Sequence, residues 1–441
     1  MIDVATIAVT LLLLFTGCFF TVSTGFVQLF GVFGKKYKSK SRTANGSKVS
    51  PFMALATALG GSIGTANIAG VAGALAIGGA GSIFWMWISG LLGMATKYAE
   101  IKLAMKYRQR NSNGELRGGA MYYMERGVGS RKMAIAFSIF CVSGALFGGG
   151  MVQSNTIAES VAGAFSAMSG QEHLTTVAIS GVLTAVLCGV VIIGGVNSIT
   201  KVATLFVPLA SVLYVGASLA VIVANLDMLP NVLRNIVAQA FGFESVLGGT
   251  AGYGIVLAMK TGITRGTFSN EAGIGSAPMA HASSSETDPH RQAMLGVIEV
   301  FADTIVICTL TALVILCSGI EIPYGNENAS GMLIAADAFA TLLGQSFSGI
   351  FLCISVILFA VTSIIGWSLY GSQSVEYMLG DKWVKRYRLM LVVFIAFGAV
   401  VPVGTVWLFG EFSNLLMASV NVIAILVLSK QVGNGKDISR I

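Results

Sequence analysis

The sequence predicts an all-α integral membrane protein with about eleven transmembrane helices. Two observations support this prediction: 55% of the 441 residues are hydrophobic, and only 11% are charged. A soluble domain carries about 25% charged residues and cannot bury so large an apolar excess. A membrane-spanning helix needs about 20 mostly apolar residues, so eleven helices use roughly half of the chain and leave little length for a soluble domain.

Apolar segments separated by polar or charged stretches define the expected helices. They fall at residues 4–22, 53–79, 83–104, 133–153, 175–196, 203–224, 246–283, 293–318, 348–370, 389–409 and 413–429. We interpret the first segment as a membrane helix and not as a signal peptide, because Met1-Ile2-Asp3 carries no positive charge and no convincing cleavage site follows.

Lysine and arginine are concentrated in alternate loops. Loop 34–50 carries six, loop 105–132 seven, loop 371–388 four and the tail 430–441 three, whereas the loops that alternate with these carry one in total, Arg234. Basic loops face the cytoplasm. We therefore expect the N-terminus outside and the C-terminus inside. The net charge of +7 then reflects membrane orientation and does not indicate a nucleic-acid partner.

Two segments are expected to break their helices. The first, Gly60 to Gly70, contains four glycines with Ser, Thr and Asn between them, and the second covers residues 260–266. Glycine frees the backbone there, and the polar side chains take up hydrogen bonds that unwinding releases. The alternative is that these glycines are packing contacts between helices.

The positions of the breaks predict the domain organisation. Residues 1–50 form an extra first helix and a basic loop. The breaks then fall in the first and sixth of the ten remaining helices, which predicts two five-helix repeats of opposite orientation, residues 51–226 and 246–429, and a tail at 430–441. Paired breaks of this kind are typical of the midplane binding site of a secondary transporter.

Each break exposes backbone groups that can bind charge. The amide groups that begin the second half of a broken helix suit a carboxylate, and the carbonyls that end its first half suit a cation, so a zwitterion such as an amino acid fits both. Thr65, Ala66 and Asn67 are expected to face the carboxylate.

A sodium ion is expected one turn before these amides. Its ligands would be the carbonyls of Gly60 and Ile63 and the adjacent hydroxyls of Thr362 and Ser363, because small hard cations prefer oxygen.

Further candidates for substrate contact are Gln153, Ser363, Trp367 and, at the second break, Met259 and Gly262. Trp367 lies one helical turn beyond Ser363 and shares its face. Two structural alternatives stay open. For Gln153, the alternative is a polar group that a neighbouring helix satisfies. For Trp367, the alternative is an anchor at the membrane interface.

Two acidic residues, Glu299 and Asp303, share one face of the segment 293–318. An ionisable residue inside a membrane is a functional hypothesis with a partner to be named, and we expect Lys260 to pair with Glu299. The alternative is that the acids lie near the cytoplasmic end and are solvated.

Several motifs resemble those of the sodium:alanine (alanine or glycine:cation) symporter family, within the amino acid–polyamine–cation superfamily. They are Gly78–Trp87, Gly64–Val71, Met94–Glu100, Arg265-Gly266 with Phe268–Gly273, and a weaker match at Phe301–Thr304. The resemblance runs from about residue 50 to about residue 375. Two residues depart from the usual family pattern: Ala66 replaces a glycine, and Lys260 replaces an apolar residue.

The resemblance implies a leucine-transporter-type fold and the import of small neutral amino acids with sodium. It also implies substrate contacts from Thr65, Ala66, Asn67, Gln153 and Trp367. No covalent bond is made or broken, so we expect a transporter in the cell membrane and not an enzyme.

Three alternatives to sodium symport follow from the sequence. In a proton-coupled transporter, Asp303 or Glu299 would titrate in place of sodium. A membrane-embedded hydrolase needs a nucleophile with a base, or a metal pair, and the apolar segments show no such spacing. A channel is disfavoured because no filter motif repeats. The sequence leaves the oligomeric state open.

Overall fold

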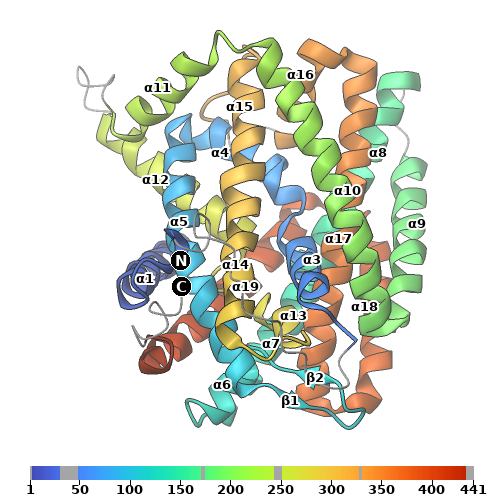
Figure 1. Cartoon of the computed structure of the whole chain (residues 1–441). Helices are drawn as coiled ribbons and strands as arrows, with labels where there is room; N and C mark the ends of the chain where they lie inside the picture. The colour runs from blue at the N-terminus through green and yellow to red at the C-terminus, as the bar shows by residue number, and fades with distance from the viewer. Residues whose placement is uncertain (1, 30–47, 170–173, 243–250, 327–329, 434–441) are drawn as a thin grey trace.

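The computed structural model describes residues 2–29, 48–169, 174–242, 251–326 and 330–433. Helices packed side by side make up nearly all of this part of the chain (Figure 1). The helices of the first half are α1 (Ile2–Ser23), α3 (Pro51–Ser62), η1 (Thr65–Asn67), α4 (Ala69–Gly78), α5 (Gly81–Tyr107), α6 (Ala120–Arg126), α7 (Arg131–Gly144), η2 (Ala145–Val152), α8 (Gln153–Ser169), α9 (Leu174–Ile193) and α10 (Gly195–Ala224).

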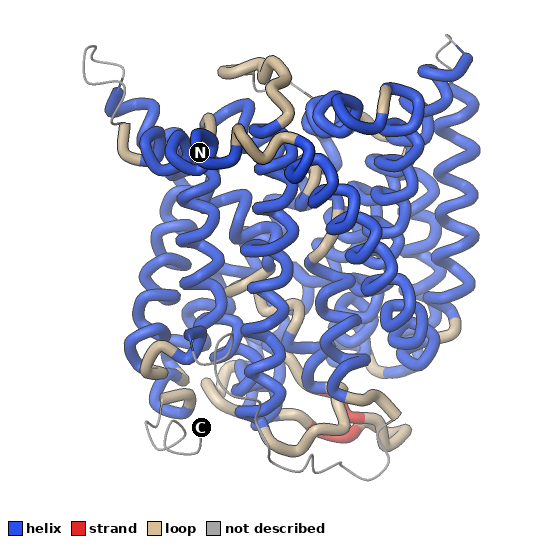
Figure 2. Tube along the Cα trace, turned by 45° about the horizontal axis from the view of Figure 1, so that its top comes forward, coloured by secondary structure: helices blue, strands red, loops and turns tan. Residues whose placement is uncertain are grey.

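The second half continues in the same way. Its helices are α11 (Leu229–Ala240), α12 (Ala251–Asn270), α13 (Pro278–Ala282), α14 (Pro289–Val300), η3 (Phe301–Cys308), α15 (Thr309–Cys317), α16 (Gly331–Leu343), α17 (Gln345–Leu379), α18 (Asp381–Gly398), α19 (Val403–Val427) and η4 (Ser429–Gln431). The strands β1 (Gln109–Arg110) and β2 (Leu116–Arg117) form a short antiparallel hairpin at one end of the bundle (Figure 2).

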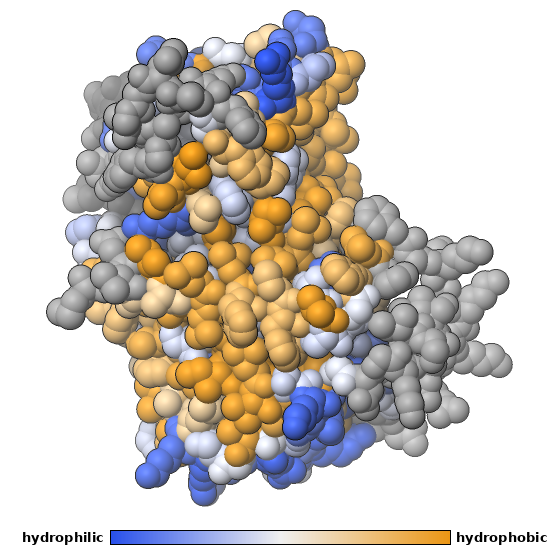
Figure 3. Space-filling model, turned by 90° about the vertical axis from the view of Figure 1, so that its left-hand side faces the viewer, coloured by the Kyte–Doolittle hydropathy of each residue, from blue (hydrophilic) through white to orange (hydrophobic). Residues whose placement is uncertain are grey.

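The prediction of an all-α membrane protein is confirmed. Within the described residues, seven helices are long and apolar enough to cross a membrane, and the bent pair α3–α4 makes an eighth. Large apolar side chains such as Val190, Val212 and Phe397 are more than half exposed. Figure 3 shows a broad hydrophobic belt with hydrophilic residues toward the ends. The number of eleven stays a prediction.

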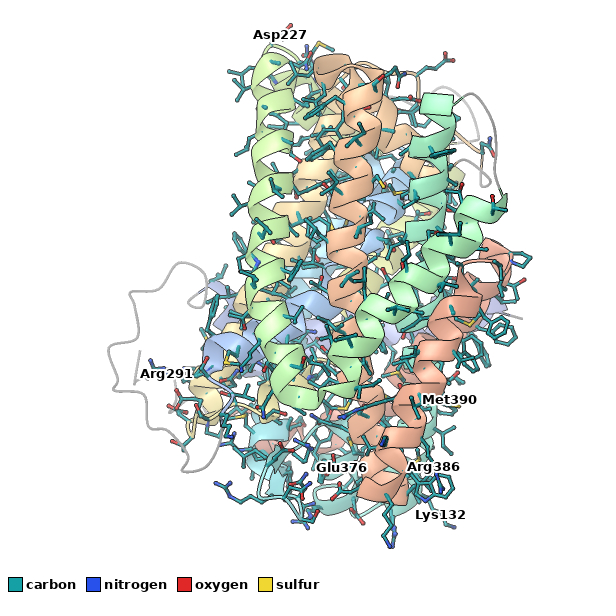
Figure 4. All side chains as sticks on the ribbon, turned by 90° about the vertical axis from the view of Figure 1, so that its right-hand side faces the viewer. Lys132, Asp227, Arg291, Glu376, Arg386 and Met390 are labelled. Atoms are coloured by element: carbon teal, nitrogen blue, oxygen red, sulfur yellow. The ribbon has the colours of Figure 1, made fainter. Side chains whose placement is uncertain are left out.

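Charge is distributed unequally between the two ends. Lys132 and Arg386 lie at one end of the bundle and Asp227 at the other (Figure 4). The basic end also holds Arg117, whose Nε donates to Glu376 Oε2 at 2.9 Å. This asymmetry agrees with the loop charges, although most of the basic loop 34–50 and the end of the tail, residues 30–47 and 434–441, lie outside the described residues.

One predicted boundary is wrong. The sequence pattern placed a loop at 410–412, but α18 ends at Gly398 and α19 begins after Pro402. Proline lacks an amide hydrogen and is well suited to a helix start. Glu411, within the predicted loop, lies inside α19 and pairs with Arg265 at 3.4 Å.

Candidate functional site

The first break lies where it was predicted. The axes of α3 and α4 differ by 61°, and the 3₁₀ turn η1 joins them. Gly64 permits a close approach to α17, because a Cβ atom at residue 64 would lie 2.6 Å from Ser363 Oγ. The glycine-rich sequence therefore gives both the bend and the contact with a helix 300 residues away.

The second break lies further along the chain than predicted. α12 runs without interruption through residues 260–266, and the two glycines in this stretch, Gly262 and Gly266, are packing contacts with α5. A Cβ at Gly262 would lie 2.1 Å from Ser82 O, and one at Gly266 would lie 2.2 Å from Ser89 Oγ. The helix ends at Asn270, and the chain becomes helical again only at Pro278. Met259 and Gly262 consequently lie outside the pocket described next.

A pocket of about 530 Å³, its open mouth included, lies between the two breaks. Gly64 and Ala66 line it from the first break, and Phe268 and Glu271 line it from the second. The remaining wall comes from helices α3, η2, α8, α17 and α19 and includes Gln153, Ser363, Trp367, Trp407, Glu411 and Asn414.

Gln153 and Trp367, two of the predicted contacts, line this pocket. Gln153 Oε1 accepts a hydrogen bond from the Thr65 amide at 3.5 Å, so it contacts the backbone of the first break. Trp367 is 4% exposed and packs closely on η2. A Cβ atom at Gly149 in η2 would lie 2.2 Å from the Cβ of Trp367. The burial of Trp367 contradicts the alternative of a membrane-interface anchor.

Asn67 is fully buried, and its side chain connects three helices. Its Nδ2 donates to Asp303 Oδ1 at 2.7 Å and to Ser269 Oγ at 3.0 Å. Its Oδ1 accepts from the Gly64 amide at 2.9 Å. The side chain of Asn67 thus fixes the first break to α12 and η3 and does not line the pocket.

The four residues predicted to bind sodium lie where α3 meets α17. Ser363 Oγ donates to the Ile63 carbonyl at 3.3 Å. A Cβ at Gly60 would lie 3.3 Å from the Thr362 carbonyl. Carbonyl and hydroxyl oxygens fit a hard monovalent or divalent cation.

The expected pair of Lys260 and Glu299 is wrong. Glu299 Oε1 accepts from Lys97 Nζ at 3.1 Å, and Glu299 Oε2 contacts His281 Nε2 at 2.8 Å. Lys97, His281 and Glu299 have no solvent exposure, so the alternative of a solvated acid is also wrong for Glu299.

Asp303 is likewise fully buried, in the π-helix η3. Its carboxylate accepts from Asn67, from Ser269 Oγ at 2.8 Å and from Thr304 Oγ1 at 2.9 Å. A second π-helix, η2, directly precedes Gln153. π-Helical turns within α-helices occur frequently at functional sites.

Among the pocket residues that sequence reasoning missed are Glu271, Trp407, Glu411 and Asn414. Glu271 belongs to one of the motifs that carried the family resemblance, which was a usable signal. The other three belong to α19, whose boundaries were predicted incorrectly.

The sequence model of the sodium:alanine symporter family matches residues 2–436. The chain belongs to this family. A similar relative is the sodium/alanine symporter AgcS of Methanococcus maripaludis, 38% identical over 95% of this chain and 91% of that protein. An uncharacterized transporter of Haemophilus influenzae is also 38% identical, over 94% and 89%. The probable sodium/glutamine symporter GlnT of Bacillus subtilis is 37% identical, over 97% and 87%.

Two solved structures show the same fold at low identity. MhsT in complex with L-phenylalanine aligns with a TM-score of 0.56 and 13% identity, covering 88% of this chain and 89% of that chain. A sodium-coupled sialic acid symporter aligns with a TM-score of 0.55 and 12% identity, covering 96% and 86%. The family member described here therefore has the predicted leucine-transporter-type fold. Its family and its structural neighbours are transporters and not enzymes.

Proposed function

We propose that this protein imports small neutral amino acids, such as alanine, glycine or close relatives, together with sodium across the cell membrane. The observation that supports this most directly is the position of Ser363. Its hydroxyl contacts the Ile63 carbonyl in the first break, and its side chain also lines the pocket. The proposed sodium ligands and the proposed substrate site then share a wall.

A shared wall gives a physical basis for coupling. An ion that orders the contact of α3 with α17 also orders one side of the pocket, so each ligand increases the affinity for the other. Sodium and substrate together would then stabilise conformations of the transporter that neither stabilises alone. The transporter would pass through these conformations as it changes between its inward- and outward-facing states. In this proposal the basic end faces the cytoplasm.

The substrate carboxylate is proposed to lie at the first break, near the amide of Ala66, with Gln153 and Trp367 around it. The names of two relatives, a sodium/alanine symporter and a probable sodium/glutamine symporter, support an amino acid as cargo. Ala66 and Trp367 both line the pocket, and their side chains favour a small substrate.

A second candidate, proton coupling, is supported by the fully buried Asp303 carboxylate. One experiment tests both candidates. Uptake of radiolabelled alanine into proteoliposomes is measured with an inward sodium gradient, with potassium in its place, and with an inward proton gradient alone. Accumulation that requires sodium supports the first candidate. Accumulation driven by the proton gradient without sodium contradicts it and supports the second.

A further inference from the structure

A fully buried histidine lies directly behind the second break. His281 belongs to α13, the short helix with which the chain resumes after the break. Its Nε2 lies 2.8 Å from Glu299 Oε2, and its Nδ1 lies 2.7 Å from Gln292 Nε2. Glu299 and Gln292 have no solvent exposure either. The function proposed above gives none of these three side chains a role.

The buried amide oxygen of Gln292 has no hydrogen-bond partner among the described residues. The amide NH2 donates to His281 Nδ1, so the ring is neutral in this orientation and donates its other N–H to Glu299. A half-turn of the amide would bring its oxygen to Nδ1, which must then carry a hydrogen as well. The ring is then a charged imidazolium, and the amide leaves its NH2 unpaired in place of its oxygen. The two arrangements therefore differ chiefly in the charge of His281.

The buried charges around His281 favour the imidazolium. Glu100 and Glu299 have no solvent exposure, and Glu271 is 3% exposed. The fully buried Lys97 interacts electrostatically with all three carboxylates and donates to one of them. Three carboxylates that share one ammonium leave an excess of negative charge, which is costly inside a protein. One proton on His281 reduces that excess.

The charged residues on the other elements packed against α13 are paired elsewhere. In β2 and α17, Arg117 and Glu376 pair with each other at 2.9 Å. Arg108, which follows α5, donates to the carbonyls of Ala282 at 3.3 Å and Ser284 at 2.7 Å. α3 contains no ionisable residue. The balance of charge at the ring is thus set by the three carboxylates and Lys97.

A cavity gives a proton access to α13. It has a volume of about 570 Å³, its open mouth included, and lies at the basic end of the bundle. Lys48, Arg117, Asn197 and Ser283 are among the residues that line it. Ser283 directly follows α13, two residues beyond His281. Solvent that enters the cavity therefore reaches the end of α13, on the side that we expect to face the cytoplasm.

We propose that His281 is a proton-binding site whose two N–H groups donate to Glu299 and Gln292, and that this proton is coupled to amino-acid binding. This inference rests on the proposed function and goes beyond it, because it adds a further ligand to the transporter. The coupling has a structural basis. α13 and the pocket residues Phe268 and Glu271 flank the same break.

The direction of the coupling follows from the charges. Protonation of His281 relieves the excess negative charge behind the second break and so stabilises the pocket wall that the break forms. We therefore expect the protonated protein to bind alanine more tightly. Because coupling between two ligands is reciprocal, alanine binding should in turn take up a proton.

The first test detects the proton directly and needs no substrate. The chain contains three histidines, so protein labelled at the histidine rings gives three sets of NMR signals, and His281→Gln identifies the set from His281. We expect this signal to move between about pH 5.5 and pH 8.5, the range in which histidine side chains change charge. In Gln292→Glu, whose ionised side chain only accepts hydrogen bonds, the signal should move at higher pH than in the wild type. A signal of His281 that does not move overturns the inference.

The second test measures the coupling. Alanine is added to purified full-length protein in weakly buffered sodium solution, and an indicator dye reports the uptake of protons. We expect uptake in the wild type and none in His281→Gln. Between about pH 5.5 and pH 8.5, the affinity of the wild type for alanine should fall about fivefold or more, the lower end of coupling between two sites. The affinity of His281→Gln should stay level over the same range.

His290→Gln is the matched control. His290 is the other histidine in the described part of the chain, it is 8% exposed, and its Nδ1 lies 2.6 Å from Tyr98 Oη. This variant should keep both the proton uptake and the pH dependence of the wild type. Thermal stabilisation by sodium should persist in every variant, which shows that each is folded.

Two results of the second test would overturn the inference while the proposed function stands. They are equal proton uptake in His281→Gln and the wild type, which places the proton on another residue, and an equal pH dependence of alanine affinity in the two proteins. Wild-type protein that binds no amino acid at all would overturn the proposed function and the coupling with it. The NMR signal of His281 would still decide whether this histidine binds a proton.

Discussion

The two breaks in the bundle are built in different ways. In the first break, Gly64 has an extended backbone with φ of −138°, and the break depends on the close contact of α3 with α17. In the second, Glu271 and Gly273 have left-handed backbones with φ of 54° and 87°. The first break presents uncharged residues such as Gly64 and Ala66 to the pocket, with the Asp303 carboxylate bonded behind it through Asn67, whereas the second presents the acidic residue Glu271. Two segments that fulfil the same architectural purpose therefore offer opposite chemistry to a ligand between them.

The largest expected effect comes from the charges near the second break. Lys97→Met leaves Glu299 buried without its cation, and removal of one partner of a buried ion pair costs about 3–5 kcal/mol. Asn67→Ala, which removes the neutral anchor of the first break, should cost only about 1–3 kcal/mol. The free energy of unfolding in mixed micelles measures both.

The double variant Lys97→Met with Glu299→Gln should recover part of the loss, because the uncompensated charge is then removed. Lys106→Met, an exposed lysine on the same helix, is the control. A loss in Asn67→Ala as large as that in Lys97→Met would contradict the difference between the breaks.

The next effect separates close contact from backbone strain. Gly64→Ala places a methyl group 2.6 Å from Ser363 Oγ, and such overpacking costs about 1–3 kcal/mol. Adding Ser363→Ala should restore most of that stability. Gly273→Ala meets the flexible end of Leu13 and also an unfavourable φ, which costs about 1–2 kcal/mol.

Adding Leu13→Ala to Gly273→Ala removes the contact with the leucine side chain but should leave the backbone strain in place. The free energy of unfolding is measured for Gly64→Ala and Gly273→Ala, for each with its second substitution, and for Ser363→Ala and Leu13→Ala alone. Together with the wild type these variants form two double-mutant cycles. Full rescue at residue 273 would show that its conformation carries no strain.

A smaller effect is expected on sodium activation. Ser363→Ala removes one of about six oxygen ligands of the proposed ion. If that ligand contributes about 1.4 kcal/mol, the sodium concentration for half-maximal uptake rises about tenfold, and the rate at saturating sodium stays close to that of the wild type. Ser180→Ala in α9, whose hydroxyl donates to Val177 O, is the matched control. An unchanged sodium dependence would remove Ser363 from the site.

The smallest effect concerns substrate size at the first break. Ala66 lines the pocket, and its methyl group would lie 3.6 Å from a Cβ at Gly70. Ala66→Gly should admit larger substrates such as serine, threonine or glutamine, with a gain of less than about tenfold, the lower end of what one methylene contributes in a pocket. Competition of labelled alanine uptake by a panel of unlabelled amino acids measures this. The same order of inhibition in both proteins means that the methyl group does not limit size.

The helical class and the first break were predictable because apolar runs and a polar glycine cluster within one of them are local signals. The second break was misplaced for a physical reason. Gly262 and Gly266 pack against α5, a contact that depends on a helix elsewhere in the chain. At the break itself, the residue with the left-handed backbone is Glu271, which is not a glycine. The partners of Glu299 could not be deduced either, because Lys97 lies 202 residues away and no local spacing connects them.

That separation between Lys97 and Glu299 has a consequence for biogenesis. A lysine in the centre of a membrane helix costs about 2.5–3.5 kcal/mol on insertion scales, and α5 is not among the helices apolar enough to span a membrane by themselves. At about 5–20 residues per second, synthesis of the intervening chain takes roughly 10–40 seconds. During that interval α5 has no Glu299 to neutralise its lysine. The nascent chain must therefore retain α5 near the insertion machinery until α14 emerges, and chains truncated before α14 should leave α5 the least securely inserted helix.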